Sequence, residues 1–408
     1  MAALDWTTIA GAALSASAAA YALLALILTR RAHAHAVRRF AAPAPAGAGA
    51  ARRGVANAPP GPVADAPGAT VLKPLCGDEP RLYENLATFC VQNHPRYQLV
   101  FGVRDAHDPA VAIVRRLQAD FPDADIALAI DPAVHGSNPK VSNLLNMLPH
   151  ARHAHLVLAD SDIAVPSDYL ARVCAPLNDT TTGVVTCLYR GRALAAGWPQ
   201  LGVQFIDDWF APSVRIAHAG GSRAFAFGAT IALRRDALQA IGGFESLAGR
   251  LADDYWLGEL TRRQGLQTVL SDVVVTTDVT ERTLKDLWRH ELRWLRTIRS
   301  LNPAGFAFTF ITFTWPMLLP GLALAPGRLG LALLLAGAAA RSALAATTAA
   351  RGGGARIGSV IAAVLRAPIR DFLLLAEWTA ALGGSNVRWR QQTLSVHDAH
   401  PLLPERTP

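Results

Sequence analysis

The sequence predicts an α/β domain with a doubly wound sheet, together with transmembrane and interfacial helices. Between residue 71 and about residue 280, short apolar runs of β type alternate with helical stretches and turns, which is typical of a sheet covered on both faces. Long uncharged segments lie near both ends of the chain. The 408 residues are 51% hydrophobic and 17% charged, against about 25% charged in soluble domains. This balance argues against a wholly soluble protein.

The chain is basic, with 39 Lys and Arg against 31 Asp and Glu and a formal net charge of +8. Such an excess suits nucleic acid, an anionic membrane surface or a phosphorylated substrate. Much of it lies beside apolar segments, at Arg30–Arg39 and Lys285–Arg299. We therefore assign the positive charge to membrane orientation and diphosphate binding, and we expect no nucleic-acid partner.

The first apolar segment, residues 7–29, has 23 residues without a charge, enough to cross an apolar layer of about 30 Å. Four arginines follow between residues 30 and 39, whereas a cleavable signal peptide carries its positive charge ahead of the apolar stretch. A buried core helix is the alternative, but length and flanks favour an uncleaved anchor in residues 1–30. The positive-inside rule then places the N-terminus outside and the chain from Arg30 onward in the cytoplasm.

The next segment, residues 31–70, is basic and then rich in Pro, Ala and Gly, which predicts an extended or disordered linker. An α/β domain at residues 71–282 follows it, with helices expected to begin at Asp108 and Ser167. Strands are expected at Tyr97–Val103, Asp125–Ile130, His155–Asp162, Thr182–Tyr189, Ala229–Arg234 and Gln267–Thr276.

Acidic side chains follow several of these strands, where doubly wound sheets bind ligands. Asp160 and Asp162 form a DxD motif whose two carboxylates lie on the same side of an extended backbone and can share a divalent cation, Mg²⁺ or Mn²⁺, with a diphosphate. Loops also carry acidic pairs for solubility or helix capping, and Asp162 could be a turn or cap residue. Asp253 and Asp254 open a predicted helix, where capping is the alternative role for Asp253.

The C-terminal part is again apolar. Residues 283–302 place apolar side chains at three- and four-residue spacings beside a stripe of arginines, which predicts a basic amphipathic helix in the membrane interface, with an ordinary surface helix as the alternative. Phe306–Leu324 and Leu329–Ala350 are candidates for a hairpin through the bilayer. Ile357–Leu382 carries charges in its middle and predicts an interfacial or re-entrant pair of short helices. We thus expect a membrane region at residues 303–390, with two or more spans, and a tail at residues 391–408.

Ordered blocks along residues 71–390 resemble the ceramide glucosyltransferase family of membrane glycosyltransferases, which is related to other inverting enzymes of the GT-A fold in families 21 and 2. The blocks are LKPLCGDEPRLYENLATF, VRDAHDPA, NPKVSNL, ADSD, GATIALRRDAL, ADDYW and RHELRW. The run at residues 201–238 is most similar to the bacterial branch associated with hopanoid biosynthesis, whose members resemble enzymes that add N-acetylglucosamine to a bacteriohopane polyol.

The resemblance implies a GT-A fold and a role for each matching residue. Asp105 would bind the uridine of the donor, Asp160 with Asp162 would bind the metal and diphosphate, and Asp254 would be the general base. The family motif (Q/R)xxRW reads HELRW here, so His290 departs from the pattern, whereas Arg293 and Trp294 match it. Either His290 or the preceding Arg289 would then contact the diphosphate. Lys140 in NPKVSN is a further candidate phosphate contact, with a surface lysine as the alternative.

The chemistry of inversion divides the work between these acids, because a base must take the proton of the acceptor hydroxyl while cations stabilise the leaving UDP. We therefore expect a multi-pass enzyme of the bacterial inner membrane, with a cytoplasmic catalytic domain, that transfers a sugar from a UDP-sugar to a lipid hydroxyl. The acceptor would be a hopanoid; ceramide or diacylglycerol is the alternative, and a non-catalytic nucleotide-binding membrane protein is a second one.

Overall fold

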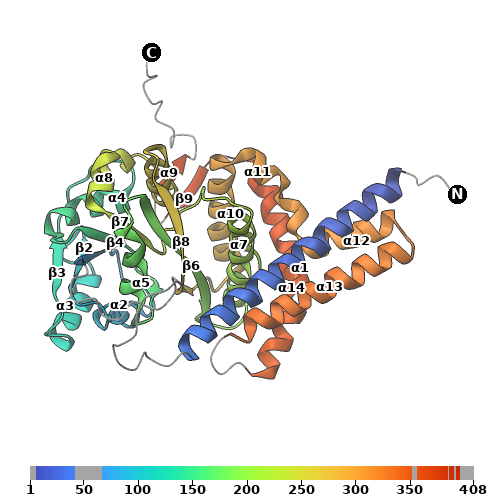
Figure 1. The fold of residues 1–408 in the computed structure, drawn as a ribbon, viewed down its shortest axis with the longest axis horizontal. Coiled ribbons are helices and arrows are strands. Elements are labelled where there is room, and N and C mark those ends of the chain that lie inside the picture. Colours follow the sequence, from blue (N-terminus) through green and yellow to red (C-terminus); the bar gives the residue numbers. More distant parts are fainter. Residues whose placement is uncertain (1–5, 42–66, 352–355, 385, 390–391, 396–408) are drawn as a thin grey trace, which may run out of the picture. The chain divides into compact units, whose positions relative to one another are not determined.

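The computed structural model describes residues 6–41, 67–351, 356–384, 386–389 and 392–395 (Figure 1). The chain forms two compact units. Unit 1 comprises Met1–Arg31, Arg190–Gly221 and Asp278–Pro408, and unit 2 comprises Ala32–Tyr189 and Ser222–Thr277. Each unit is built from segments that are distant in the sequence, so neither corresponds to one continuous stretch of chain.

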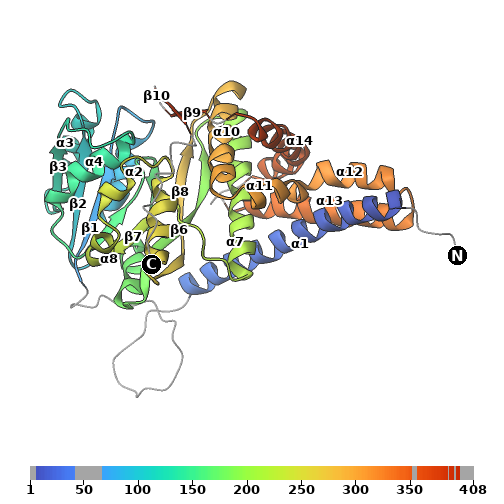
Figure 2. The same cartoon turned by 90° about the horizontal axis from the view of Figure 1, so that it is seen from above.

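Unit 2 is built around a mixed sheet with the strand order β3-β2-β1-β4-β7-β6-β8-β5 (Figure 2). The strands are β1 (Ala69–Pro74), β2 (Tyr97–Val103), β3 (Ile126–Ile130), β4 (His155–Leu158), β5 (Ile163–Ala164), β6 (Thr182–Ala193), β7 (Ile231–Arg234) and β8 (Gln267–Val279), and the last residues of β6 and β8 belong to unit 1. Strands β3, β2, β1 and β4 are parallel, whereas β7 is antiparallel to β4 and β6. The six expected strands are confirmed; β1 and the two-residue β5 were not among them.

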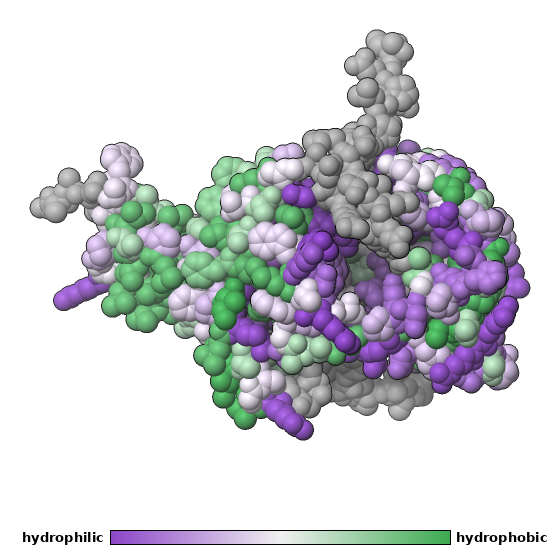
Figure 3. Space-filling view, turned by 180° about the vertical axis from the view of Figure 1, so that it is seen from behind, coloured by the Kyte–Doolittle hydropathy of each residue, from purple (hydrophilic) through white to green (hydrophobic). Residues whose placement is uncertain are grey.

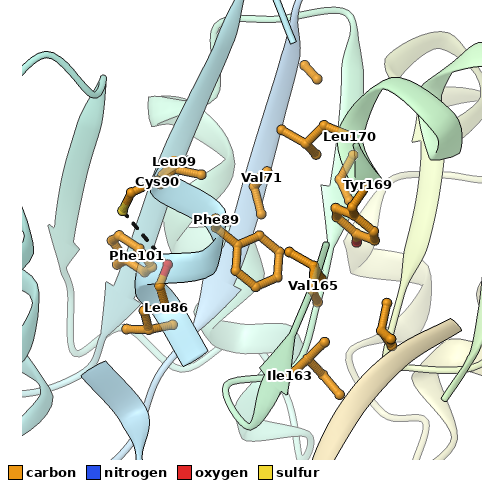
Figure 4. Close-up of a cluster of buried hydrophobic side chains, with 14 of the residues drawn as sticks. Val71, Leu86, Phe89, Cys90, Leu99, Phe101, Ile163, Val165, Tyr169 and Leu170 are labelled. Carbon is orange, nitrogen blue, oxygen red and sulfur yellow. Dashed lines mark hydrogen bonds between the residues drawn. The ribbon is translucent and has the colours of Figure 1, made fainter. Parts of the chain in front are cut away.

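Helices cover both faces of this sheet. They are α2 (Leu82–Cys90), α3 (Ala110–Asp120), α4 (Pro139–Met147), α5 (Tyr169–Cys174), α8 (Arg235–Ala240) and α9 (Asp253–Arg263), with short 3-10 turns at Leu148–His150, Ala175–Asn178 and Phe244–Leu247. Phe89 of α2 lies in the middle of the core on one face, edge-on to Tyr169 of α5 with ring centroids 5.7 Å apart (Figure 4). Helix α4 covers the other face, where Asn143 Nδ2 donates to the carbonyl oxygen of Gly102 at 2.8 Å.

Unit 1 is mainly helical. Its helices are α1 (Trp6–Ala41, of which the residues up to Arg31 belong to this unit), α6 (Trp198–Gln204), a π-helical turn (Phe205–Phe210), α7 (Ala211–Ala219), α10 (Leu284–Leu301), α11 (Pro303–Phe308), a 3-10 turn (Thr309–Thr312), α12 (Thr314–Leu324), α13 (Arg328–Ala349) and α14 (Ile357–Leu382). Strands β9 (Asn386–Trp389) and β10 (Gln392–Ser395) pair antiparallel. The side chain of Thr283 caps α10, so the expected amphipathic helix forms over the expected residues.

Two described helices are long and apolar enough to cross a membrane, Trp6–His35 within α1 and Arg328–Ala349. Helices α1, α12 and α13 lie side by side (Figures 1 and 2), and a Cβ added at Gly321 of α12 would lie 2.1 Å from the side-chain oxygen of Ser15. Such close backbone approach at small residues is typical of helices packed in a membrane. Figure 3, drawn from behind, shows hydrophobic residues over much of the helical part that projects from unit 1.

The segment expected to cross as one helix, Phe306–Leu324, is broken. Residues Pro303–Thr312 and α12 meet at a bend of 68°, because Phe313 adopts an extended conformation with φ −83° and ψ 93°. The candidate span is thus a bent pair of helices, and its crossing of the bilayer stays a prediction. The second half of the expected hairpin, Leu329–Ala350, is the continuous helix α13.

Helix α14 is one continuous helix of 26 residues, so the expectation of two short helices is wrong. The charges that suggested a break face inward and are paired. Arg370 is 1% exposed. Its guanidinium donates to Glu291 of α10 at 2.7 Å and to Glu377, which lies about two turns further along α14. The outward face of α14 carries apolar side chains, from Ile357 to Phe372.

A second buried cation, Arg341 of α13, holds three helical segments of unit 1 together. Its guanidinium lies 2.9 Å from Asp208 in the π-helical turn and 2.9 Å from Asp371 of α14. The hydroxyl of Thr348 donates to the other oxygen of Asp208 at 2.6 Å. The cation that interrupts an apolar segment of the sequence is therefore shared by two carboxylates inside the unit.

Replacing Arg341 with Met should destabilise the protein, because it leaves Asp208 and Asp371 buried without their cation. Breaking a buried pair in this way costs roughly 3 to 5 kcal/mol of the free energy of unfolding. Unfolding of the full chain in detergent measures the effect, with Arg328→Met at the exposed start of the same helix as the matched control. Equal stability of the two variants would contradict the role given to Arg341.

Candidate active site

Charged side chains from three elements of unit 2 meet beyond the carboxyl end of β4. Lys140, in the first turn of α4, places its Nζ 2.7 Å from Oδ1 of Asp160 and 3.4 Å from Oδ2 of Asp253. Burial opposes a charged lysine, yet the negative charges of Asp160, Asp253 and Asp254 raise the pKa of Lys140 above its usual value. The lysine is therefore an inward cation shared by carboxylates, which rules out the surface alternative.

The start of α4 fixes the position of this lysine. Asn138 caps the helix by accepting hydrogen bonds from the backbone N–H groups of Lys140 at 2.9 Å and Val141 at 3.2 Å, and Pro139 occupies the first helical position. The Asn138 amide nitrogen also donates to the carbonyl oxygen of Arg250 at 2.8 Å. One side chain thus joins the start of α4 to the loop that precedes α9.

Asp254, in the first turn of α9, is held by backbone groups. Its Oδ2 accepts from the N–H of Gly228 at 2.9 Å and its Oδ1 accepts from the N–H of Tyr255 at 2.8 Å. Burial, followed by the charge of Asp253, raises the pKa of Asp254 to about 6, against the opposing charge of Lys140. A carboxylate with such a pKa is ionised at neutral pH and can accept a proton readily.

Gly228 allows this close arrangement. A Cβ added there would lie 2.9 Å from Oδ2 of Asp160 and 3.1 Å from Nζ of Lys140. A larger residue would push apart the two ends of the ion pair and shift the N–H that Asp254 accepts. The sequence analysis singled out neither Gly228 nor Asn138, although both lie in blocks that carry the family resemblance.

Asp162 and Lys73 lie beside Asp160. Oδ2 of Asp162 accepts from the hydroxyl of Thr277 at 2.6 Å, and burial together with the charge of Asp160 raises the pKa of Asp162 to about 7. Lys73, at the end of β1, is fully buried, and its Nζ donates to the backbone oxygen of Asp160 at 2.7 Å. Burial lowers the pKa of Lys73 to about 7. The sequence feature that could have pointed to Lys73 is a single lysine inside an otherwise apolar run.

Asp160 and Asp162 could supply some, but not all, of the ligands of a divalent cation. Two neighbouring carboxylates are suitable ligands, and burial followed by the charge of Asp160 raises the pKa of Asp162, an effect that a bound cation would oppose. Among the described residues, no group of three or more His, Cys, Asp or Glu side chains is arranged to hold a metal ion. A cation here would therefore need further oxygen ligands from water or from a diphosphate.

Asp105 forms its hydrogen bonds outside the cluster of Lys140, Asp160 and Asp253. It follows β2 in a turn, its side chain is 69% exposed, and it accepts from the backbone N–H of His107 at 2.9 Å. In the part of the chain that the structure describes, no hydrogen bond or ion pair links it to Lys140 or Asp160. The nearby Asp108 accepts from the N–H of Gly77 at 2.9 Å and so ties the loops after β1 and β2 together.

The three motif residues of α10 belong to unit 1. The ring of His290 lies edge-on to Trp294 with centroids 4.6 Å apart, and Trp294 packs against Phe205 at 5.6 Å. Nδ1 of His290 is hydrogen-bonded to Glu281, a residue that the sequence analysis did not single out. Arg293 lies on the same helix. Binding of the donor by His290, Arg293 and Trp294 stays a prediction.

Comparison with known proteins finds relatives and a shared fold. The chain is 26% identical to ceramide glucosyltransferase 3 of Caenorhabditis elegans over 245 residues, covering 58% of this chain and 52% of that protein. It is 31% identical to a ceramide glucosyltransferase of Candida albicans over 123 residues, covering 27% and 23%. The chain thus spans about half the length of the first of these relatives and about a quarter of the second.

Among solved structures, mannosyltransferase PcManGT from Pyrobaculum calidifontis, in complex with GDP-Man and Mn²⁺, matches 91% of this chain and 97% of its own, with a TM-score of 0.50 and 22% identity. This likeness confirms the GT-A fold that the sequence predicts. The family model for glycosyl transferase family 21 matches residues 13–401. The chain therefore belongs to glycosyl transferase family 21.

Proposed function

We propose that this chain is a membrane-bound inverting glycosyltransferase that transfers a hexose from a UDP-sugar to the hydroxyl of a lipid. The observation that carries the proposal is Asp254, a carboxylate held by two backbone N–H groups beside the cluster of Lys140 and Asp160. More specifically, we propose N-acetylglucosamine as the sugar and a bacteriohopane polyol as the acceptor. A binding protein without catalysis would need no base beside a diphosphate site.

In this proposal Asp254 removes the proton from the acceptor hydroxyl as its oxygen forms a bond to the anomeric carbon. The bond from that carbon to the diphosphate breaks on the opposite face, and UDP leaves with the electron pair. The two N–H groups fix the direction of the Asp254 carboxylate, so that the base need not reorganise during the reaction. Asp253 supports this geometry through Lys140 and is not itself assigned as a base.

Donor binding would use the other candidate residues. Asp160 and Asp162 would hold a divalent cation, Mg²⁺ or Mn²⁺, which supplies positive charge to the diphosphate when bound. Lys140 would contact the phosphates, Asp105 the uridine, and His290 with Arg293 and Trp294 the donor from α10. The PcManGT complex contains Mn²⁺ with its nucleotide sugar, which supports a cation in this fold.

The membrane supplies the acceptor in this proposal. Two candidate spans and the bent pair of α11 and α12 give unit 1 an apolar surface suited to lipid. We propose that the chain lies in the bacterial inner membrane with its sugar-transfer domain in the cytoplasm. A second candidate function is glucosyl transfer to ceramide or diacylglycerol, and the similarity to ceramide glucosyltransferases favours the ceramide form.

Incubating membranes that contain the full chain with labelled UDP-N-acetylglucosamine or UDP-glucose, and with hopanoid, ceramide or diacylglycerol, should yield one glycolipid by mass spectrometry. We expect a mass gain of one N-acetylhexosamine on the hopanoid. A hexose on ceramide would support the second candidate instead. Binding of UDP-sugar without any lipid product would contradict the enzymatic proposal and favour a nucleotide-binding protein.

Replacing Asp254 with Asn should lower the rate of transfer by roughly 10² to 10⁴, because the base is lost while the side chain keeps its size. Binding of the UDP-sugar, measured by calorimetry, should change little. Asp253→Asn is the matched control, since it removes the charge of the neighbouring acid but keeps the base. Full turnover in the Asp254 variant, at unchanged stability, would overturn the assignment of the base.

Transfer should also depend on pH. The pKa of Asp254 is raised to about 6, so the base is mostly ionised at pH 7 and mostly protonated at pH 5. We expect kcat/KM for the lipid to be about tenfold lower at pH 5 than at pH 7, since activity requires the ionised form. Donor binding followed over the same range separates this effect from loss of substrate. A flat profile would be incompatible with Asp254 as the titrating base.

A further inference from the structure

Unit 1 carries a second group of charges, which sugar transfer does not use. Arg190 at the end of β6, Arg215 on α7 and Arg351 just after α13 lie around Asp207 in the π-helical turn, near enough for their charges to act on one another. We call these three arginines the arginine cluster. Its counter-ion Asp207 accepts from the backbone N–H of Gly191 at 3.0 Å.

The arginine cluster holds more positive charge than its surroundings compensate. The neighbouring Asp208 is already shared by Arg341 and Thr348, so it is not available as a full partner. Burial and the charge of Asp208 raise the pKa of Asp207 to about 7, whereas the hydrogen bond from Gly191 and the charges of Arg351 and Arg190 oppose this shift. One carboxylate, Asp207, is therefore the main counter-ion of three guanidinium groups.

Two of these guanidinium groups also have unused donors. Within the described residues, Arg215 forms no hydrogen bond or ion pair, although it is only partly exposed to water. Its pKa is lowered to about 10 by burial and by the charge of Arg351. The Nε of Arg351 is buried and has no hydrogen-bond partner. A buried donor without a partner, such as Nε of Arg351, is costly, and an anion at this point would satisfy it and the donors of Arg215.

The position of the arginine cluster indicates where such an anion would come from. A guanidinium nitrogen of Arg351 donates to the carbonyl oxygen of Thr29, the last residue of the uncharged stretch of α1. Arg351 itself follows the end of the apolar helix α13. Two candidate spans therefore end together at the arginine cluster, which is the level of lipid headgroups in a bilayer. Leu23 and Leu24, one to two turns back along α1, are exposed.

We propose that the arginine cluster binds the phosphate of an anionic phospholipid, whose acyl chains lie along the exposed apolar face of α1. Guanidinium groups match phosphate oxygens in geometry and stay charged. Arginines that only orient a span in the membrane extend their charged ends into water, whereas Arg215 is half-buried and the guanidinium of Arg351 has a buried Nε and contacts the backbone of α1. This lipid is a bound partner distinct from the sugar acceptor, so the proposal does not depend on the proposed function.

The test uses the full chain in a mild detergent, titrated with phosphatidylglycerol, phosphatidylcholine or inorganic phosphate and followed by native mass spectrometry. We expect one phosphatidylglycerol to bind at least about tenfold more tightly than phosphatidylcholine, because only the former keeps a net negative charge. Inorganic phosphate should compete only at far higher concentration. Equal affinity for the two lipids would overturn the proposal. Competition by phosphate at the concentration of the lipid would leave a free phosphate site and overturn the lipid part.

The variant that tests the site is Arg215→Gln, since Arg215 forms no bond that the substitution would break among the described residues. It should lose the preference for phosphatidylglycerol by about tenfold, whereas Arg215→Lys should keep most of it. Arg328→Gln, at the other end of α13, is the matched control and should bind as the unmodified chain does. An unchanged preference in Arg215→Gln would overturn the site, and thermal unfolding of each variant confirms that the comparison is made on folded protein.

Discussion

The candidate active site depends on the ammonium group of Lys140. Three carboxylates from two elements, Asp160, Asp253 and Asp254, converge on it, and without a cation their mutual repulsion would drive the loop after β4 away from the start of α9. Asn138 fixes the lysine by capping α4. The same arrangement separates the roles of the two adjacent acids: the carboxylate of Asp253 faces the lysine, whereas Asp254 is held by backbone N–H groups and keeps a pKa of about 6.

In unit 1, too, buried cations are each shared by two carboxylates. Arg341 joins Asp208 and Asp371, and Arg370 joins Glu291 to Glu377. Each arginine forms ion pairs with two buried acids, so charged residues can stand in apolar helices without facing lipid. This explains why α14 is continuous although its sequence carries charges. The arginine cluster around Asp207 is the exception, because there the cations outnumber the carboxylates.

The sequence predicted the features that depend on local pattern. The apolar runs located the strands, the three- and four-residue spacing located α10, and the acids after strands pointed to Asp160 and Asp254. It could not predict pairings between distant residues, such as Arg341 with Asp208, because these depend on how segments more than a hundred residues apart pack together. For the same reason the sequence predicted a break in α14. A phosphate contact at Lys140 stays a prediction, whereas the ion pairs of this lysine follow only from the fold.

The departure of α10 from its family motif has a structural counterpart. His290 stands where the motif has Gln or Arg, and the structure pairs it with Glu281, whose pKa is lowered by the hydrogen bond from that imidazole against the effect of burial. This hydrogen bond ties the imidazole at the departing motif position to the segment that precedes α10. Trp294, edge-on to the imidazole, further restricts its orientation.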